Sequence, residues 1–221
     1  MKPPSDRRRL ILSSLAALAT VLAVQSLVWP RRPSVAPLNA SAIGRQLSSH
    51  GFAASRQQDL PAQRSQERAR SVGLVFSLGQ GQTLRLARGV ARERDDFALA
   101  FLTSDAPALK LLGRSITSDP TGPSARGRIG TAATRQTCLV IGPGQSGGFG
   151  VTNEELLPVI DPLPRDLRQR VESLLGLRLA RAYECAVISL SASDPAMLTD
   201  PHWSRLLQVL RPVLASGGAN R

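Results

Sequence analysis

Aromatic residues are scarce in this chain, and so are the side chains that most often ligate metals. Phenylalanine, tryptophan and tyrosine make up 4% of the 221 residues, and there are two histidines and two cysteines. Proteins that bind single-stranded nucleic acid stack its bases on aromatic rings, so the composition disfavours this class. The few histidines and cysteines also leave little material for a zinc or haem centre. We therefore expect no cofactor and no metal site.

Lysine is scarce as well, although the chain carries a formal net charge of +12. The segments 1–9 and 31–71 carry +3 and +5 of this charge, which leaves +4 over 72–221. A domain that follows a phosphate backbone needs a denser basic face than this. We therefore expect no nucleic-acid partner.

Residues 10–28 form a long uncharged run that follows a basic stub containing Arg7, Arg8 and Arg9. As a helix the run extends about 28 Å, close to the ~30 Å hydrocarbon core of a bilayer. The tryptophan and proline that follow suit the membrane interface and the end of a helix. The pattern predicts a transmembrane helix over 10–28.

A cleaved signal peptide is the alternative for the same segment. Its best cleavage site follows Ser26, which is a small residue. The apolar run is longer than the ~7–15 residues typical of a signal peptide, and it continues through Leu27 and Val28. We therefore expect a retained anchor in the plasma (inner) membrane, with residues 1–9 in the cytoplasm and the C-terminal domain outside the cytosol.

Residues 29–71 are predicted to form a basic, flexible stalk. Arginines outnumber acidic residues in this segment, and four prolines interrupt it. Few large apolar side chains are present to offset the chain entropy lost on folding. A short helix over 40–50 fits the i, i+4 spacing of Ile43 and Leu47. The arginines suit anionic headgroups, which makes membrane lipid an expected partner.

From residue 72 onward the pattern changes to strands and amphipathic helices. Strands are predicted over 72–78, 83–92, 135–141 and 177–190, and helices over 165–175 and 203–214. Residues 113–130, rich in Ser, Pro, Gly and Arg, are expected to form a mobile loop. Because regular βαβ spacing is missing, the expected fold class is α+β. It comprises a domain over 72–221 with a mainly antiparallel sheet and flanking helices.

The first two strands are predicted to form a hairpin, joined by a turn at 79–81. In the second strand, Leu84 and Leu86 are expected on one face, with Arg85 and Arg88 on the other. Gly89 is a candidate position for a β-bulge.

Cys138 and Cys185 both lie in predicted strands. A domain outside the cytosol meets oxidising conditions, where two cysteines permit one intramolecular disulfide. The bond would close a loop of about 47 residues and stabilise the fold by about 4 kcal/mol in the chain-entropy model. Two separate buried thiols are the alternative. A catalytic role is not expected, because the chain has no C-x-x-C pair and neither cysteine is near a histidine in sequence.

Residues 144–148 match the G-x-S-x-G pattern of serine hydrolases, with Ser146 at the position of the nucleophile. Asp161 or Asp194, followed by His202, would complete the chain order of such a triad. A nucleophile elbow requires a helix that begins at the serine, whereas the glycines after Ser146 are poor helix formers. We therefore expect no catalytic residues, with a membrane-anchored hydrolase using Ser146 as the alternative.

Several short motifs follow the apolar run and the basic segment. They are Thr137-Cys138-Leu139-Val140, Gly150-Val151-Thr152 and Glu184-Cys185. This layout, over 10–214, resembles the cyanoexosortase A system-associated proteins, which are small accessory proteins of exosortase systems. The resemblance implies a non-enzymatic protein of exopolysaccharide-linked export in the cell envelope. Its implied partner is a multi-pass exosortase, a membrane protease that sorts proteins bearing a C-terminal signal. The resemblance carries over no catalytic residues.

Overall fold

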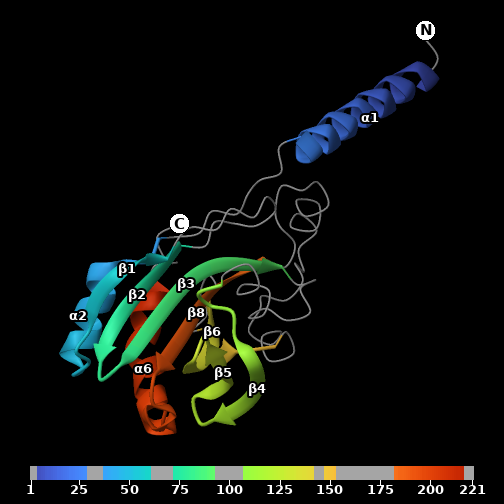
Figure 1. The fold of residues 1–221 in the computed structure, drawn as a ribbon. Coiled ribbons are helices and arrows are strands. Elements are labelled where there is room, and N and C mark those ends of the chain that lie inside the picture. The colour runs from blue at the N-terminus through green and yellow to red at the C-terminus, as the bar shows by residue number, and fades with distance from the viewer. Residues whose placement is uncertain are drawn as a thin grey trace. The chain divides into compact units, whose positions relative to one another are not determined.

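The computed structural model describes residues 4–28, 37–60, 72–92, 107–141, 147–152 and 182–216, and it divides the chain into two units. The described part of the first unit is helix α1 (Pro4–Val28), which covers the whole uncharged run 10–28 (Figure 1). Within the described residues, no helix combines the length and the apolarity needed to cross a membrane. A membrane-spanning role for α1 therefore stays a prediction.

The second unit is an α+β domain built on a mainly antiparallel sheet, as the sequence predicts. The strand order is β1-β2-β3-β8-β6-β5-β4, with β7 paired to β6. The strands are β1 (Ser55–Leu60), β2 (Val72–Gly79), β3 (Gln82–Arg92), β4 (Leu112–Asp119), β5 (Gly122–Ile129), β6 (Ala132–Ile141), β7 (Phe149–Gly150) and β8 (Ala182–Ala192). The described helices of this unit are α2 (Ala40–Ser49), the short 3₁₀ helix η1 (Pro195–Met197) and α6 (Asp200–Ser216).

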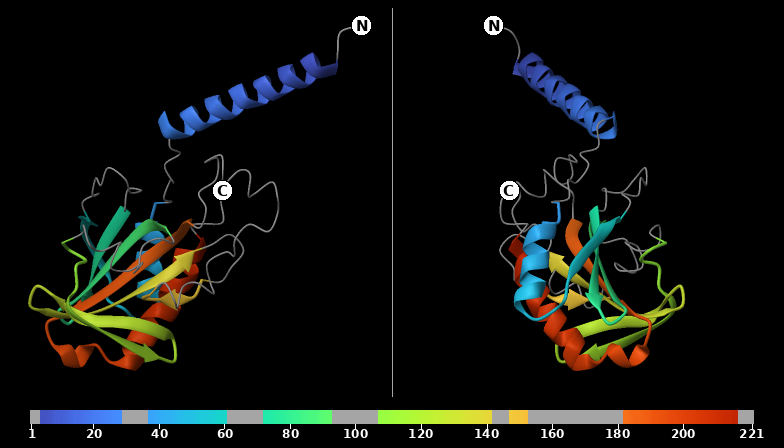
Figure 2. Two further views of the ribbon diagram at one scale, coloured as in Figure 1. Left: turned by 90° about the vertical axis from the view of Figure 1, so that its right-hand side faces the viewer. Right: turned by 60° about the vertical axis from the view of Figure 1, so that its left-hand side comes forward.

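Helices α2 and α6 pack side by side on one face of the sheet, which we call the helix face (Figure 2). Residues two apart in a strand share a face, so alternate positions of β2, β3, β6 and β8 meet the apolar sides of both helices. Burial of this apolar surface, at roughly 25 cal/mol per Å², is the main force that holds the helices to the sheet. The core of the helix face includes Ile43, Leu47, Phe76, Leu84, Leu86, Leu139, Ile188, Trp203, Leu206 and Leu210.

The opposite face of the sheet has an apolar half and a polar half. In the apolar half, the residues that β3, β6 and β8 contribute pack against Leu109 and Val151. The polar half lies toward the turn that joins β2 to β3. The apolar residues from the three strands are Ala87, Cys138, Val140, Cys185 and Val187.

The flexible stalk predicted for 29–71 is wrong for residues 37–60, whereas the short helix predicted over 40–50 within it is confirmed by α2. Helix α2 buries Ile43 and Leu47 in the core of the helix face, and β1 pairs with β2. The side chain of Asn39 caps α2 by accepting a backbone N–H of its first turn. The segment is polar overall, but its apolar residues share one helical face, so tertiary packing stabilises the helix.

The mobile loop predicted for 113–130 is also wrong, because β4 and β5 form a hairpin there. At its turn the Asp119 carboxylate accepts the backbone N–H of Thr121 at 2.7 Å. Gly122 follows with φ 129°, a conformation that glycine adopts readily. The small and polar residues of this segment have low strand propensity, and pairing of β5 with β6 outweighs it.

The remaining elements agree with the sequence in part. The hairpin of β2 and β3, strand β6 and the final helix lie where they were predicted. The helix predicted over 165–175 lies outside the described residues. No bulge occurs at Gly89, which pairs with Cys185 in an unbroken register, and the irregularity lies between Ser77 and Gly79 instead.

Arg205 fixes the C-terminal end of α2 to α6. Its guanidinium donates to the carbonyl oxygen of His50 at 2.6 Å and lies 5.7 Å from the ring centroid of Phe52. Phe52 also packs edge-on against His202, with ring centroids 5.4 Å apart. Burial, followed by the positive charge of Arg205, lowers the pKa of His202.

The lowered pKa of His202 predicts that stability depends on pH. The ordinary pKa is 6.5, and the folded value lies below it, so the unfolded chain binds the proton first as the pH falls. We expect the free energy of unfolding to decrease below about pH 6.5, and this part of the decrease to vanish in His202→Gln. Urea unfolding at several pH values, followed by circular dichroism, measures the effect.

The matched control is His50→Gln, which alters the only other histidine of the chain. That variant should keep the pH dependence of the parent protein. An unchanged slope in His202→Gln would contradict the assignment.

Candidate functional site

Cys138 and Cys185, the candidate disulfide, lie on the neighbouring strands β6 and β8. Their Cα atoms are 5.8 Å apart and their sulfur atoms are joined. This Cα separation is within the roughly 4.4–6.8 Å usual for disulfides. Both side chains are fully buried in the apolar half of the face opposite the helices. The pair therefore joins two strands at the centre of the sheet.

The residues of the alternative hydrolase triad are only partly described. Ser146 and Asp161 lie outside the described residues. Asp194 caps η1, since its carboxylate accepts the backbone N–H of Ala196 at 2.9 Å. His202 lies on α6 against Phe52. Both described members of the predicted triad thus have structural contacts of their own.

For Arg85 and Arg88 of β3, the sequence placed Arg85 on the correct face and Arg88 on the wrong one. Arg85 and Arg88 were predicted on one face, but residues three apart in a strand point to opposite faces. Arg88 lies on the helix face with Leu84, and its side chain is 1% exposed. It forms an ion pair with Glu184 of β8. The odd spacing of the two arginines was the signal that could have separated them.

Arg135 of β6 is the second buried arginine on the helix face. Its guanidinium forms ion pairs with Asp119 at the β4–β5 turn and with Asp200 at the start of α6. Its Nε donates to the Ser124 hydroxyl at 2.8 Å, and its Cζ lies 5.2 Å from the Trp203 ring centroid. One side chain therefore connects the sheet, the β4–β5 hairpin and α6.

Asp200 also accepts a hydrogen bond from Arg126 at 2.6 Å. The hydrogen bond from Arg135, followed by the charges of Arg135 and Arg126, holds the pKa of Asp200 below its usual value. An ionised carboxylate in the first turn of α6 is also favoured by the helix dipole. The Asp200 carboxylate thus balances the positive charges of Arg126 and Arg135 and the partial positive charge at the N-terminal end of α6.

Arg85 of β3 has a different environment. It points to the face opposite the helices and is half-buried, and burial lowers the pKa of its guanidinium. Its Nη1 donates to the Ser191 hydroxyl at 2.8 Å. Among the described residues, no carboxylate forms an ion pair with it. Arg85 therefore differs from Arg88 and Arg135, each of which has an acidic partner.

The buried polar side chains next to Arg85 have partners. The hydroxyls of Thr134 and Ser191 are 2.9 Å apart. Gln136 donates through Nε2 to the Ser189 hydroxyl at 3.0 Å and to the Leu109 carbonyl oxygen at 2.7 Å. These bonds fix the side chains beneath and beside Arg85, as expected for a preorganised polar surface. Serines, threonines and glutamines in a strand carry no distinctive pattern, so these residues could not be identified from the sequence.

No group of three metal-ligating side chains occurs within the described part of the chain. Comparisons with protein-family models, curated proteins and solved structures found no match. The interpretation of the polar surface around Arg85 therefore rests on the contacts of its own residues.

The Arg88–Glu184 pair predicts a specific stability effect. Removing one partner leaves a buried charge without compensation, which costs about 3–5 kcal/mol. We expect Arg88→Met to lower the free energy of unfolding by roughly that amount. The double variant Arg88→Met/Glu184→Leu should recover most of the loss, because two apolar side chains of similar size leave no buried charge. Urea unfolding of the three proteins measures both effects.

The matched control is Arg56→Met, which breaks an ion pair with Asp59 whose side chains are 51% and 65% exposed. Exposed pairs contribute about 0–1 kcal/mol, so this variant should stay close to the parent protein. A double variant no more stable than Arg88→Met would disprove the compensation.

The cysteine pair predicts the result of an alkylation experiment. If the bond forms in the purified protein, Cys138 and Cys185 should resist alkylation in denaturant until a reductant is added. Replacing both by serine should then destabilise the fold by about 4 kcal/mol, on the chain-entropy estimate for this loop. Mass spectrometry counts the alkylated thiols. Immediate labelling of both cysteines without reductant would establish free thiols.

Proposed function

We propose that this chain is a membrane-anchored, non-enzymatic accessory protein of an exosortase-type protein-sorting system linked to exopolysaccharide export. It would be held in the plasma membrane by α1 in a single pass, with its N-terminus in the cytoplasm and its α+β domain outside the cytosol. Its partners would be membrane lipid and a multi-pass exosortase.

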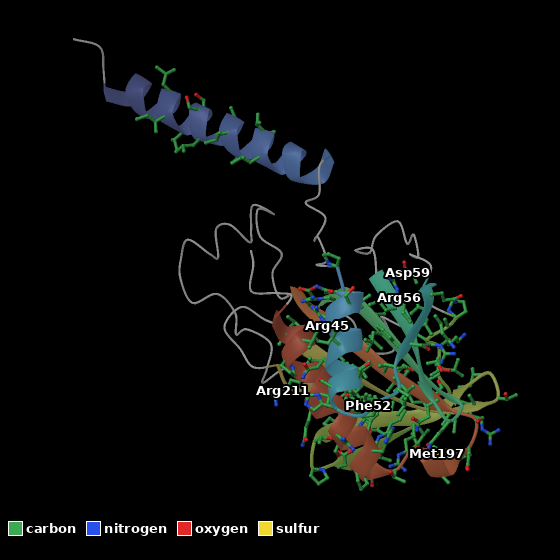
Figure 3. The ribbon with its side chains drawn as sticks, turned by 90° about the vertical axis from the view of Figure 1, so that its left-hand side faces the viewer. Arg45, Phe52, Arg56, Asp59, Met197 and Arg211 are labelled. Carbon is green, nitrogen blue, oxygen red and sulfur yellow. A yellow bond between two sulfur atoms is a disulfide. The ribbon has the colours of Figure 1, made fainter. Side chains whose placement is uncertain are left out.

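The exposure of apolar side chains on several sides of α1 carries the proposal. Leu10, Ile11 and Leu12 are 67%, 55% and 65% exposed. Successive residues of an α-helix point about 100° apart, so these three already face different directions. Side chains project from more than one side of α1 in Figure 3. Apolar side chains exposed on several sides of a helix suit a bilayer or the inside of a larger protein, although α1 as a whole falls short of the apolarity typical of a membrane span.

The polar side chains within α1 support the same interpretation. Ser14 donates to the Leu10 carbonyl oxygen at 2.8 Å, and Thr20 donates to that of Ala16 at 2.9 Å. Hydroxyls that bond within their own helix need no water, which lowers the cost of placing them in hydrocarbon. The serines and threonines that dilute the apolar run are thus compatible with a lipid environment.

The accessory role is supported by the resemblance to the cyanoexosortase A system-associated proteins. No observation favours the alternative serine hydrolase, whose Ser146 lies outside the described residues.

The test of the proposal is a topology experiment on the full chain. A reporter that is active only outside the cytosol, fused after Arg221, should be active, and the protein should remain in the carbonate-washed membrane pellet. Leu18→Arg should shift protein to the soluble fraction, because arginine at the centre of a span costs about 2.5–3.5 kcal/mol of insertion free energy. Ile116→Arg, on an exposed position of β4, is the matched control and should not.

Three outcomes would contradict the proposal. An inactive reporter would reverse the orientation, and a soluble product that begins at Leu27 would establish a cleaved signal peptide. In cells that lack this protein, Ser146→Ala should restore processing of sorted proteins as well as the parent chain does. Failure of Ser146→Ala alone would favour the hydrolase.

A further inference from the structure

We propose that Arg85 and the hydroxyl side chains around it form a binding site for a carboxylate-bearing ligand. The site, which we call the hydroxyl patch, consists of Arg85, Thr83 and Ser77, with Ser191 and Thr134 beside them. It lies in the polar half of the sheet face away from α2 and α6. The proposal depends on the α+β domain alone, so its failure would leave the membrane anchor untouched.

The strand register brings the members of the hydroxyl patch together. Ser77 of β2 pairs with Thr83 of β3, Thr83 pairs with Ser191 of β8, and Ser191 pairs with Thr134 of β6. Directly paired residues share a face, with side chains about 4.5–5.5 Å apart at Cβ. Arg85 is two residues after Thr83 and therefore lies on the same face. Four hydroxyls thus form one row across four strands beside one guanidinium.

The patch has both an accessible part and a fixed part. Ser77, Thr83 and Arg85 are half-buried, whereas Thr134 and Ser191 are buried. The buried hydroxyls bond to each other, and Ser191 accepts from Arg85 Nη1. The guanidinium is therefore held in place before any ligand arrives, which reduces the entropy lost on binding.

The lack of an acidic partner for Arg85 within the described residues indicates what the ligand carries. Among the described side chains of the central strands β3 and β6 there are three arginines, Arg85, Arg88 and Arg135. Arg88 pairs with Glu184, and Arg135 pairs with Asp119 and with the first residue of α6. Arg85 has a serine hydroxyl and no acidic partner among the described residues. A desolvated cation without an anion is unfavourable, and proteins retain such groups where they act on a ligand.

The geometry of the guanidinium favours a carboxylate over a phosphate. Nη1 donates to Ser191, and within the described residues the edge formed by Nε and Nη2 has no acceptor, so that edge suits a planar, bidentate ligand. One guanidinium balances the single negative charge of a carboxylate, whereas a phosphate monoester carries about −1.5 to −2. The hydroxyls of Ser77 and Thr83 can then donate to or accept from polar groups next to the carboxylate.

Binding measurements on the full chain in detergent micelles test the proposal. The first pair of probes is tri-alanine with a free C-terminal carboxylate and the same peptide amidated. The second pair is glucuronate and glucose. We expect the peptide acid, the sugar acid or both to bind, each at least about tenfold more tightly than its neutral counterpart. Isothermal titration calorimetry measures the affinities, and the pair that differs identifies the source of the carboxylate.

Variants at Arg85 separate charge from geometry. Arg85→Gln should weaken carboxylate binding by at least about tenfold, and Arg85→Lys should weaken it as well, because lysine keeps the charge but loses the bidentate edge. The matched control is Arg128→Gln, which removes an exposed cation from β5. This control should leave the affinity unchanged.

Thermal unfolding distinguishes a ligand site from a structural arginine. Without ligand, Arg85→Gln should keep or raise Tm, because it removes a half-buried charge that has no acidic partner among the described residues. A fall in Tm as large as that of Arg88→Met would overturn the proposal. Equal affinity for the acid and its neutral counterpart would also overturn the proposal. So would the absence of binding of either acid at roughly 10 mM, a concentration that detects a Kd of 1 mM, or about −4.1 kcal/mol of binding free energy.

Discussion

The buried guanidinium of Arg135 is the polar contact that fixes how three parts of the α+β domain are placed. Its ion pairs with Asp119 and Asp200 attach the β4–β5 hairpin and the start of α6 to the central strand β6. Trp203, fully buried on α6, lies against the same guanidinium. A buried guanidinium is unfavourable unless carboxylates balance its charge and acceptors take its N–H groups. Strand β6, the β4–β5 hairpin and the start of α6 must therefore come together to satisfy Arg135.

The two faces of the sheet satisfy buried charge in different ways. On the helix face, Arg88 and Arg135 each have carboxylate partners in a largely apolar core. On the opposite face, Arg85 lies among hydroxyl and amide groups that bond to one another. The helix face therefore holds the domain together, whereas the polar half of the opposite face adds little apolar burial to its stability.

The two edges of the described sheet differ as well. Strand β1 is polar, has an irregularity between Arg56 and Gln58, and carries the exposed Arg56–Asp59 ion pair (Figure 3). Such features protect an edge from pairing with other chains. Strand β4 instead exposes Leu112 and Ile116. The protection of β1 agrees with a domain that stays monomeric along that edge.

The sequence by itself determined the elements whose residues repeat with a clear period. The uncharged run 10–28, the β2–β3 hairpin, strand β6 and the final helix all follow from apolar spacing and turn residues. The α+β class followed from their order. The sequence also singled out Cys138 and Cys185, since an even pair in two strands allows one bond.

Only the tertiary structure decided which polar segments fold and where the arginines lie. Residues 37–60 and 113–130 have the composition of a stalk and a loop, yet packing on the sheet and pairing along it make them α2, β1, β4 and β5. The arginines depend on partners distant in sequence, since Arg135 meets Asp200 across 65 residues. The hydroxyl patch likewise draws single residues from four strands. The local sequence pattern cannot predict such contacts, because strand register and the packing of α6 on the sheet bring these side chains together.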